Sequence, residues 1–399
     1  MRVLFATTGD AGHLLPLLPF AQAAQAAGHE VRVATQRSRA EAVQAAGLTP
    51  WPFDDPPAAE WGPVMGSFAA LSIDEANVRM VQDVFGRIDT RAALPGMHAA
   101  VAEWRPDLIV REQSEFASVL AAEHHQVPLA RVALGLEASE RWLAGLAAGA
   151  VDELRAQDGL PPDPAGVALL RGALLTLTPS ALEDPAVPTG PDTHRFRAAA
   201  GPPGAPDPWP PGDDPPVYLS FGSVAARLGF FPVLYAAAIE ALAALPVRLL
   251  VTTGLGGDPA ALGPVPANVR AAPWIDQAAV TAHAAAMVGH GGYGSTLGAL
   301  ADGVPLVLVP LFAGDQWANA RRVAEVGAGL LVQDAAGSGR GGMAPPAPEA
   351  FEELPRAVAR VLDEPAFAST ARAIGGEIAA LPEVDAAVGV LEALPARAG

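Results

Sequence analysis

Cysteine is absent from this chain of 399 residues, which excludes disulfide bonds, thiolate nucleophiles and cysteine-ligated zinc. Long apolar runs are absent too. The start, Met1–Ala6, turns polar at Thr7, and no later run reaches the roughly 18 residues of a membrane span. This start is too short for the core of a signal peptide, so we expect a cytoplasmic protein without membrane insertion.

Basic residues are scarce relative to acidic ones. The chain has 25 Lys and Arg against 43 Asp and Glu, a formal charge of −18 and a pI of about 4.8. Phosphate backbones and anionic membranes repel such a chain, which argues against nucleic acid as a partner. An anionic ligand would have to be bound locally, by helix dipoles and a few hydrogen-bond donors.

The length and the patterning predict two α/β domains, because 399 residues with 51% hydrophobic content exceed one ordinary core. Short β-rich runs alternate with helical patterns in both halves, which is typical of doubly wound parallel sheets. We expect strands at Val3–Ala6, Glu30–Ala34, Asp107–Val110, Leu129–Ala133, Val217–Phe221, Val247–Thr252, Val269–Ala271, Ala286–Gly289, Leu306–Val309 and Leu330–Val332. Long loops are expected at residues 52–68 and 158–166.

A proline-rich stretch separates the two halves. Residues 201–216 contain eight prolines in sixteen positions, a composition that supports neither a helix nor an interior strand. We expect an N-terminal Rossmann-like domain over 1–200, a linker over 201–216, and a C-terminal Rossmann-like domain over 217–399 whose final helices pack back on the first. The two domains would face a cleft at the carboxyl ends of their strands, where such sheets bind ligands.

The stretch Gly289–Thr296, which reads GHGGYGST, is the most informative part of the chain. It follows the apolar run Ala285–Val288 and precedes the helix-compatible run Leu297–Ala301. A strand end, a glycine-rich turn and a helix start gather free backbone N–H groups at the positive end of a helix dipole. The pattern predicts a phosphate cradle. It is not a P-loop, because no lysine follows the glycines.

Three further segments end at the same expected edge of the second sheet. Phe221–Ser223 closes its first strand, and Trp274 offers an indole that can stack on a nucleobase. A third segment runs from strand to helix and places Asp315 and Gln316 where a carboxylate and an amide can meet sugar hydroxyls.

The ordered set of these motifs resembles the family 1 glycosyltransferases, which use nucleotide sugars and have the GT-B fold. The chain is most similar to actinobacterial members that glycosylate natural products such as antibiotics. The motifs read Trp-x-x-Gln at 274–277, His-Gly-Gly-x-Gly-Ser-Thr at 290–296, Gly-Val-Pro at 303–305 and Asp-Gln-x-x-Asn-Ala at 315–320. The resemblance covers nearly the whole chain and implies a nucleotide-sugar co-substrate, no other cofactor and no metal.

The resemblance also implies roles for individual residues. Trp274 stacks on the base, and Ile275 pairs with the base through its backbone. The diphosphate is held by Ser223, His290, Gly294, Ser295 and Thr296, the transferred sugar is bound by Asp315 and Gln316, and Gln277 and Gly292 complete the donor-binding set.

Gly298 departs from the pattern of family members that use UDP-sugars, which often place a Glu there to hold both ribose hydroxyls. Without that carboxylate a 2′-hydroxyl loses a partner, so we expect a dTDP-sugar rather than a UDP-sugar. A second departure, Ile275-Asp276 where a proline usually precedes the Gln, changes little.

The first strand leads into a Gly-His-x-x-Pro motif at His13, where the family places its catalytic histidine. An imidazole that titrates near neutrality suits the base that removes the acceptor proton. The family often adds a carboxylate that orients the imidazole. Glu112 is the candidate here and Glu115 the alternative. The resemblance implies a hexosyltransferase that works by a single displacement with inversion, without a metal.

The sequence leaves several questions open. A non-catalytic nucleotide-sugar-binding or activating relative, and a GT-B sugar-nucleotide epimerase or hydrolase, are the alternatives. The acceptor would be bound by loops in 52–100 and 136–175, and the sequence of these loops does not identify it. The deoxysugar and the hydrophobic natural product are therefore implied by the resemblance only. The oligomeric state is open, a homodimer included. The remaining histidines are expected to be structural or solvated: His29, His98, His124, His125, His194 and His283.

Overall fold

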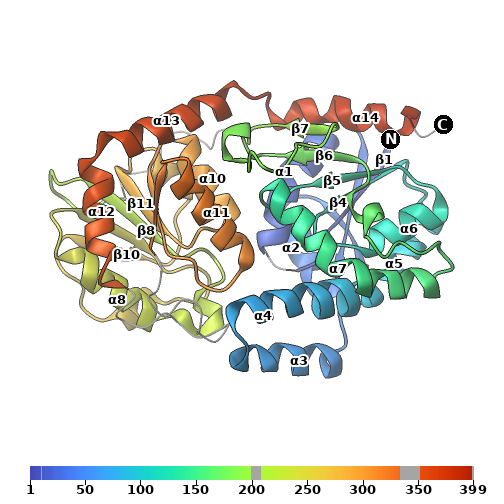
Figure 1. Cartoon of the computed structure of the whole chain (residues 1–399), viewed down its shortest axis with the longest axis horizontal. Helices are drawn as coiled ribbons and strands as arrows, with labels where there is room; N and C mark the ends of the chain where they lie inside the picture. The colour runs from blue at the N-terminus through green and yellow to red at the C-terminus, as the bar shows by residue number, and fades with distance from the viewer. Residues whose placement is uncertain (10, 199–207, 333–350, 398–399) are drawn as a thin grey trace.

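A computed structural model describes residues 1–9, 11–198, 208–332 and 351–397, which form two α/β domains side by side (Figure 1). The strands are β1 (Arg2–Ala6), β2 (Glu30–Gln36), β3 (Thr49–Phe53), β4 (Leu108–Glu112), β5 (Leu129–Val132), β6 (Ala173–Thr176), β7 (Thr193–Arg195), β8 (Pro216–Ser220), β9 (Arg248–Thr252), β10 (Val269–Ala272), β11 (Ala286–Gly289), β12 (Leu306–Leu308) and β13 (Gly329–Leu331). The α-helices are α1 (Ala11–Ala26), α2 (Ala40–Ala45), α3 (Ala58–Ser67), α4 (Ile73–Arg79), α5 (Thr90–Ala99), α6 (Ala117–His125), α7 (Glu137–Gln157), α8 (Val233–Ala243), α9 (Gln277–Thr281), α10 (Tyr293–Ala301), α11 (Gly314–Glu325), α12 (Leu354–Asp363), α13 (Pro365–Ala380) and α14 (Ala387–Arg397).

Each domain is built on one parallel sheet. Within the described residues the first sheet has seven strands in the order β3-β2-β1-β4-β5-β6-β7, and the second has six in the order β10-β9-β8-β11-β12-β13. Every pairing within them is parallel. Both orders reverse direction next to their first strand, as in Rossmann-like sheets. The predicted fold, two doubly wound domains, is confirmed.

The strands are buried on both faces because helices cover both sides of each sheet. In β1, Val3 and Phe5 join the core that includes α1, whereas Leu4 and Ala6 join the core formed with α5 and α6. This division follows from the two-residue period of a strand. It also explains why the strand segments read as nearly continuous apolar runs.

The prediction of a loop over 52–68 was wrong. Residues 49–53 form β3, and residues 58–67 form the helix α3. β3 lies at the edge of the first sheet, so Pro50 and Pro52 need not donate to a second neighbour. The loop predicted over 158–166 is confirmed, since no helix or strand is present there. β6 and β7 were not predicted.

The last helices connect the two domains. Ala371 and Ile374 of α13 pack in a core of the C-terminal domain, and Leu391 and Leu394 of α14 pack in the core that contains β1 and α1 (Figure 1). Of the expected linker, residues 201–207 lie outside the described residues, and Pro216 begins β8. Within the described ranges no helix is both long and apolar enough to cross a membrane.

The strand order fixes where a site can form. β1 and β4 are neighbours, and the chain leaves β1 towards His13 and ends β4 at Glu112. β8 and β11 are neighbours in the second sheet, and they end at Ser220 and Gly289. These are the two switch points at which open α/β sheets bind ligands.

Candidate active site

His13 and Glu112 meet at the switch point of the first sheet. The distance from His13 Nδ1 to Glu112 Oε1 is 3.2 Å. The Glu112 side chain is fully buried, whereas 22% of the His13 side chain is exposed. Because a carboxylate only accepts, Nδ1 carries the proton and Nε2 is left to face a substrate.

The backbone holds the Glu112 carboxylate in place. Its Oε1 also accepts the Thr8 N–H at 3.1 Å, and its Oε2 accepts the Ser114 N–H at 2.6 Å. The alternative acid, Glu115, is equally buried, but it accepts the Ser118 N–H instead at 3.1 Å, and burial raises its pKa to about 7. The structure therefore pairs the histidine with Glu112 and not with Glu115.

Three acids control the titration of His13. Burial lowers the pKa of the imidazole, whereas the charge and the hydrogen bond of the Glu112 carboxylate raise it, and Asp315 and Asp89 raise it further. The net result is a pKa raised above its ordinary value of 6.5. Asp315 lies in the first turn of α11 in the C-terminal domain, so this interaction also shows that the ends of the two sheets face each other.

Asp89 was not predicted from the sequence. It ends the π-helical segment Met80–Asp89, and its Oδ2 accepts a long hydrogen bond of 3.4 Å from the Thr8 hydroxyl. Burial raises the pKa of Asp89 to about 7, although Thr8 and His13 lower it. An acid whose pKa is raised to about 7 therefore lies beside the His13–Glu112 pair.

Two contacts fix the His13 ring. Gly9 has a φ of +80°, and a Cβ added there would lie 3.0 Å from His13 Cδ2. The Phe85 ring packs edge-on against the imidazole at 5.3 Å between centroids. Only glycine fits at position 9 without displacing the histidine.

The phosphate cradle, residues 289–296, lies at the carboxyl end of β11 as predicted. Among the residues that the structure describes, no side chain caps its helix, α10, which leaves the N–H groups of the first turn for a ligand. A Cβ at Gly294 would meet nothing within 4 Å, which leaves open space over that turn. Ser295 is partly buried, and among the described residues the buried Thr296 hydroxyl has no hydrogen-bond partner.

His290 is a neutral donor rather than a cation. Burial lowers its pKa to about 4, and in the described part of the chain no group bonds its Nδ1. A Cβ at Gly222 or Gly292 would lie within 2.6 Å of the ring, so both glycines make room for it. Gly222 precedes Ser223 in the turn after β8, which brings that serine beside the cradle.

Asn319 and Gln316 shape the loops around the cradle. Asn319 Nδ2 donates to the carbonyl of Gly291 at 2.9 Å. The side-chain oxygen of Gln316 accepts the N–H groups of Leu311 and Phe312 at 2.9 and 3.2 Å, and the residue is only 3% exposed. Gln316 therefore has only its amide NH₂ left for a sugar, and Asn319 is a positioning residue.

Trp274 and its neighbours follow β10. Trp274 is 65% exposed, so it is not a core residue and its ring is open to a ligand. Ile275 is partly buried and packs against the core of the C-terminal domain that includes residues of β11 and β12. Gln277 Nε2 donates to the carbonyl of Ser295 at 2.9 Å and lies 2.7 Å from where a Cβ of Gly298 would be. The Gln277 side chain thus covers Gly298, the position that the sequence analysis linked to the choice of nucleotide.

Side chains from the N-terminal domain hold the donor loops. Asn77 of α4 accepts the Gly314 N–H at 2.8 Å and donates to the carbonyl of Phe312 at 3.1 Å. The Tyr293 hydroxyl lies 3.1 Å from the Thr178 hydroxyl. These contacts join the two halves of the site.

The comparisons with known proteins agree with this geometry. Residues 238–394 match the family described as erythromycin biosynthesis protein CIII-like, C-terminal domain. The chain is 36% identical to an L-demethylnoviosyl transferase of Streptomyces niveus, over 83% of this chain and 85% of the other. It is 31% identical to a 4′-demethylrebeccamycin synthase of Lentzea aerocolonigenes, over 98% and 99%.

A crystal structure of the glycosyltransferase VinC in complex with dTDP superposes with a TM-score of 0.73 at 26% identity, over 100% of both chains. Sequence similarity over most of the chain and a common two-domain architecture lead to one conclusion. The chain belongs to the family 1 glycosyltransferases of GT-B fold that act in actinobacterial natural-product biosynthesis.

Proposed function

We propose that this protein is an inverting glycosyltransferase that moves a deoxysugar from a dTDP donor to a hydroxyl of a hydrophobic natural product. The observation that carries the proposal is the His13–Glu112 pair, 3.2 Å apart, facing Asp315 of the other domain. It is the arrangement of an oriented base next to a sugar-binding carboxylate.

In the proposed reaction, His13 Nε2 removes the acceptor proton while the acceptor oxygen attacks the anomeric carbon. Glu112 stabilises the imidazolium that forms, as the acid of a catalytic triad does, without itself taking the proton. The bond from the anomeric carbon to dTDP breaks in the same step, so the configuration inverts. General-base assistance of this kind typically contributes about 10²–10⁴ in rate.

The departing dTDP gains negative charge. The free N–H groups of the first turn of α10, with the Thr296 hydroxyl and the neutral His290, are the donors that would stabilise that charge. The proposed transfer therefore needs no metal. Among the described residues, the one cluster with metal-ligand geometry is formed by His98, His124 and Asp158, on other elements.

Two observations favour a dTDP donor, those on Gly298 and on VinC, and a third, on Trp274, supports a nucleotide donor in general. Gly298 offers no carboxylate to a ribose 2′-hydroxyl, and the Gln277 side chain occupies the space above it. The exposed Trp274 face suits a nucleobase. VinC, which resembles this chain over its whole length, is described as bound to dTDP.

The first test is thermal stabilisation by dTDP, UDP, GDP and ADP. A ligand at about 100 times its dissociation constant adds about 2.7 kcal/mol to native stability. We expect a larger melting-temperature rise with dTDP than with UDP, and a loss of that difference in Gly298→Glu. Preference for UDP would refute the donor assignment but not the transferase.

The second test is transfer from dTDP-deoxysugars to a panel of hydrophobic aglycones, followed by mass spectrometry, with the anomeric configuration of the product read by NMR. A retained configuration would refute the single displacement. Binding of dTDP without transfer to any acceptor would favour the non-catalytic relative, and conversion of the nucleotide sugar alone would favour the epimerase or hydrolase.

A further inference from the structure

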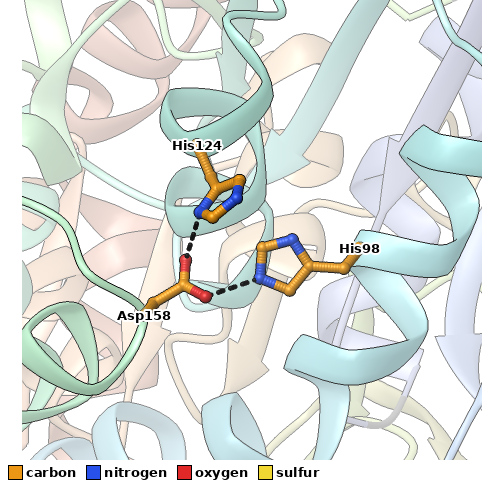
Figure 2. A group of neighbouring side chains, drawn as sticks. All are labelled: His98, His124 and Asp158. Atoms are coloured by element: carbon orange, nitrogen blue, oxygen red, sulfur yellow. Dashed lines mark hydrogen bonds and ion pairs between the residues drawn. The ribbon is translucent and has the colours of Figure 1, made fainter.

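His98, His124 and Asp158 gather in the N-terminal domain (Figure 2). His98 belongs to the last turn of α5, His124 to the last turn of α6, and Asp158 directly follows α7. α6 starts near the carboxyl end of β4 and runs back for nine residues, or about 13 Å. The cluster is therefore remote from the transfer site.

Both imidazoles turn a nitrogen towards one carboxylate, as Figure 2 shows. His98 Nε2 lies 2.9 Å from Asp158 Oδ1, and His124 Nδ1 lies 3.4 Å from Asp158 Oδ2. The three ligand atoms, one from each residue, lie within 4.8 Å of one another. Asp158 Oδ2 is shielded from solvent, and in the described part of the chain it accepts no hydrogen bond, since its contact with His124 is an ion pair.

A fourth residue orients the cluster. His125 Nε2 lies 3.0 Å from His98 Nδ1, on the side of the ring away from Asp158. When His98 donates from Nδ1 to His125, its Nε2 presents a lone pair towards the carboxylate. Histidine ligands of metals are usually held in this way, by a partner at the second ring nitrogen.

The local electrostatics favour a cation. α6 and α7 both end at the cluster, with nine and 21 residues, and helix carboxyl ends carry partial negative charge. The carboxylate of Asp158 adds a full negative charge, and the chain as a whole carries −18.

We propose that His98 Nε2, His124 Nδ1 and Asp158 bind one divalent transition-metal ion, with Zn²⁺ as the best fit, and that water completes the coordination. Two imidazoles and one carboxylate suit Zn²⁺, whereas Mg²⁺ and Ca²⁺ prefer oxygen ligands. The ion ties together the ends of α5, α6 and α7. Its role is to stabilise the N-terminal domain, independently of the transferase activity proposed above.

The test is calorimetric titration of the untagged full chain with ZnCl₂, together with the melting temperature. We expect one Zn²⁺ per chain with an affinity in the micromolar range or tighter, a raised melting temperature, and no rise with MgCl₂. Co²⁺ should give visible absorption bands that report nitrogen and oxygen ligands.

His124→Ala, His98→Asn and Asp158→Asn should each weaken Zn²⁺ binding at least tenfold, and His125→Ala about 10- to 100-fold through lost orientation. His194→Ala is the matched control, because His194 also contacts an aspartate, Asp192 at 2.9 Å, but belongs to no three-ligand cluster among the described residues. The His124 side chain is half exposed, so the metal-free fold should survive its loss. Absence of Zn²⁺ binding by the wild type, or equal binding by these folded variants, would overturn the proposal.

Discussion

Replacing Glu112 by Gln removes a negative charge from a fully buried side chain with little change in shape. The carboxylate accepts from three donors, namely His13 Nδ1–H, the Thr8 N–H and the Ser114 N–H. An amide has one accepting oxygen, so its NH₂ group must face at least one of these donors. A buried donor without an acceptor costs about 1–3 kcal/mol of stability.

The loss of transition-state stabilisation is expected to exceed this loss of folding stability. Without the charge, the imidazolium that forms at His13 loses its partner, so transfer should fall by about 10²–10⁴, the usual contribution of a general base. Since Glu112 is the main group that raises the pKa of His13, the Glu112→Gln variant should have a lower pKa there. The acidic limb of the pH–rate profile should move to lower pH, because the base acts only when it is neutral.

The assay is an NMR titration of ¹⁵N-labelled histidine side chains, which needs no acceptor, with His13→Asn used for assignment. The matched control is Glu115→Gln, since Glu115 is buried in the same segment but contacts Ser118 rather than His13. An unchanged His13 titration in Glu112→Gln, or an equal change in Glu115→Gln, would refute the pairing.

Three other changes test separate parts of the site. Burial raises the pKa of Asp89 to about 7, whereas an unfolded Asp titrates near pH 4. Between these two pH values the folded state keeps a proton that the unfolded state has lost. The stability of the wild type should therefore fall as the pH rises from about 4 to 7. Asp89→Asn should therefore raise the melting temperature more at pH 8 than at pH 5, and an equal gain at both would contradict this. Trp274→Ala should weaken dTDP binding by about 5- to 150-fold through lost base stacking, while the melting temperature of the free protein barely changes. Gly291 has a φ of +84°, and Gly291→Ala would place a Cβ 2.6 Å from the Gln316 carbonyl oxygen, so this variant should lose both stability and dTDP affinity. Gly145→Ala is the control, because a Cβ there meets nothing within 4 Å and should change neither property.

The fold was largely predictable because its strands are buried on both faces and read as apolar runs. β11 lies at the predicted residues, and β1 differs by one residue. β3 was missed because Pro50 and Pro52 argue against a strand wherever the edge position is unknown. α3 was missed because Gly62 and Pro63 interrupt its helical pattern.

The positions of His13 and of residues 289–296 at the strand ends were predictable, because neighbouring residues form a motif there, and their roles in catalysis and phosphate binding stay predictions. Asp89 has no such motif, since only the continuous helical run from α4 brings it beside Thr8. His98 and His124 were expected to be structural or solvated, and the carboxylate that they share was not foreseen, because it comes from the end of a third helix. Gln316 was expected to bind the sugar, but its side-chain oxygen is engaged by the loop backbone. Contacts between segments that are far apart in the chain leave no recognisable motif in the sequence of either segment.

The most direct test of the central claim compares His13→Ala with the wild type, using the donor and acceptor that the transfer panel identifies. We predict that kcat/KM falls by about 10²–10⁴, while stabilisation by dTDP stays the same, since His13 lies outside the phosphate cradle. Transfer by His13→Ala at the wild-type rate would contradict the assignment of His13 as the base.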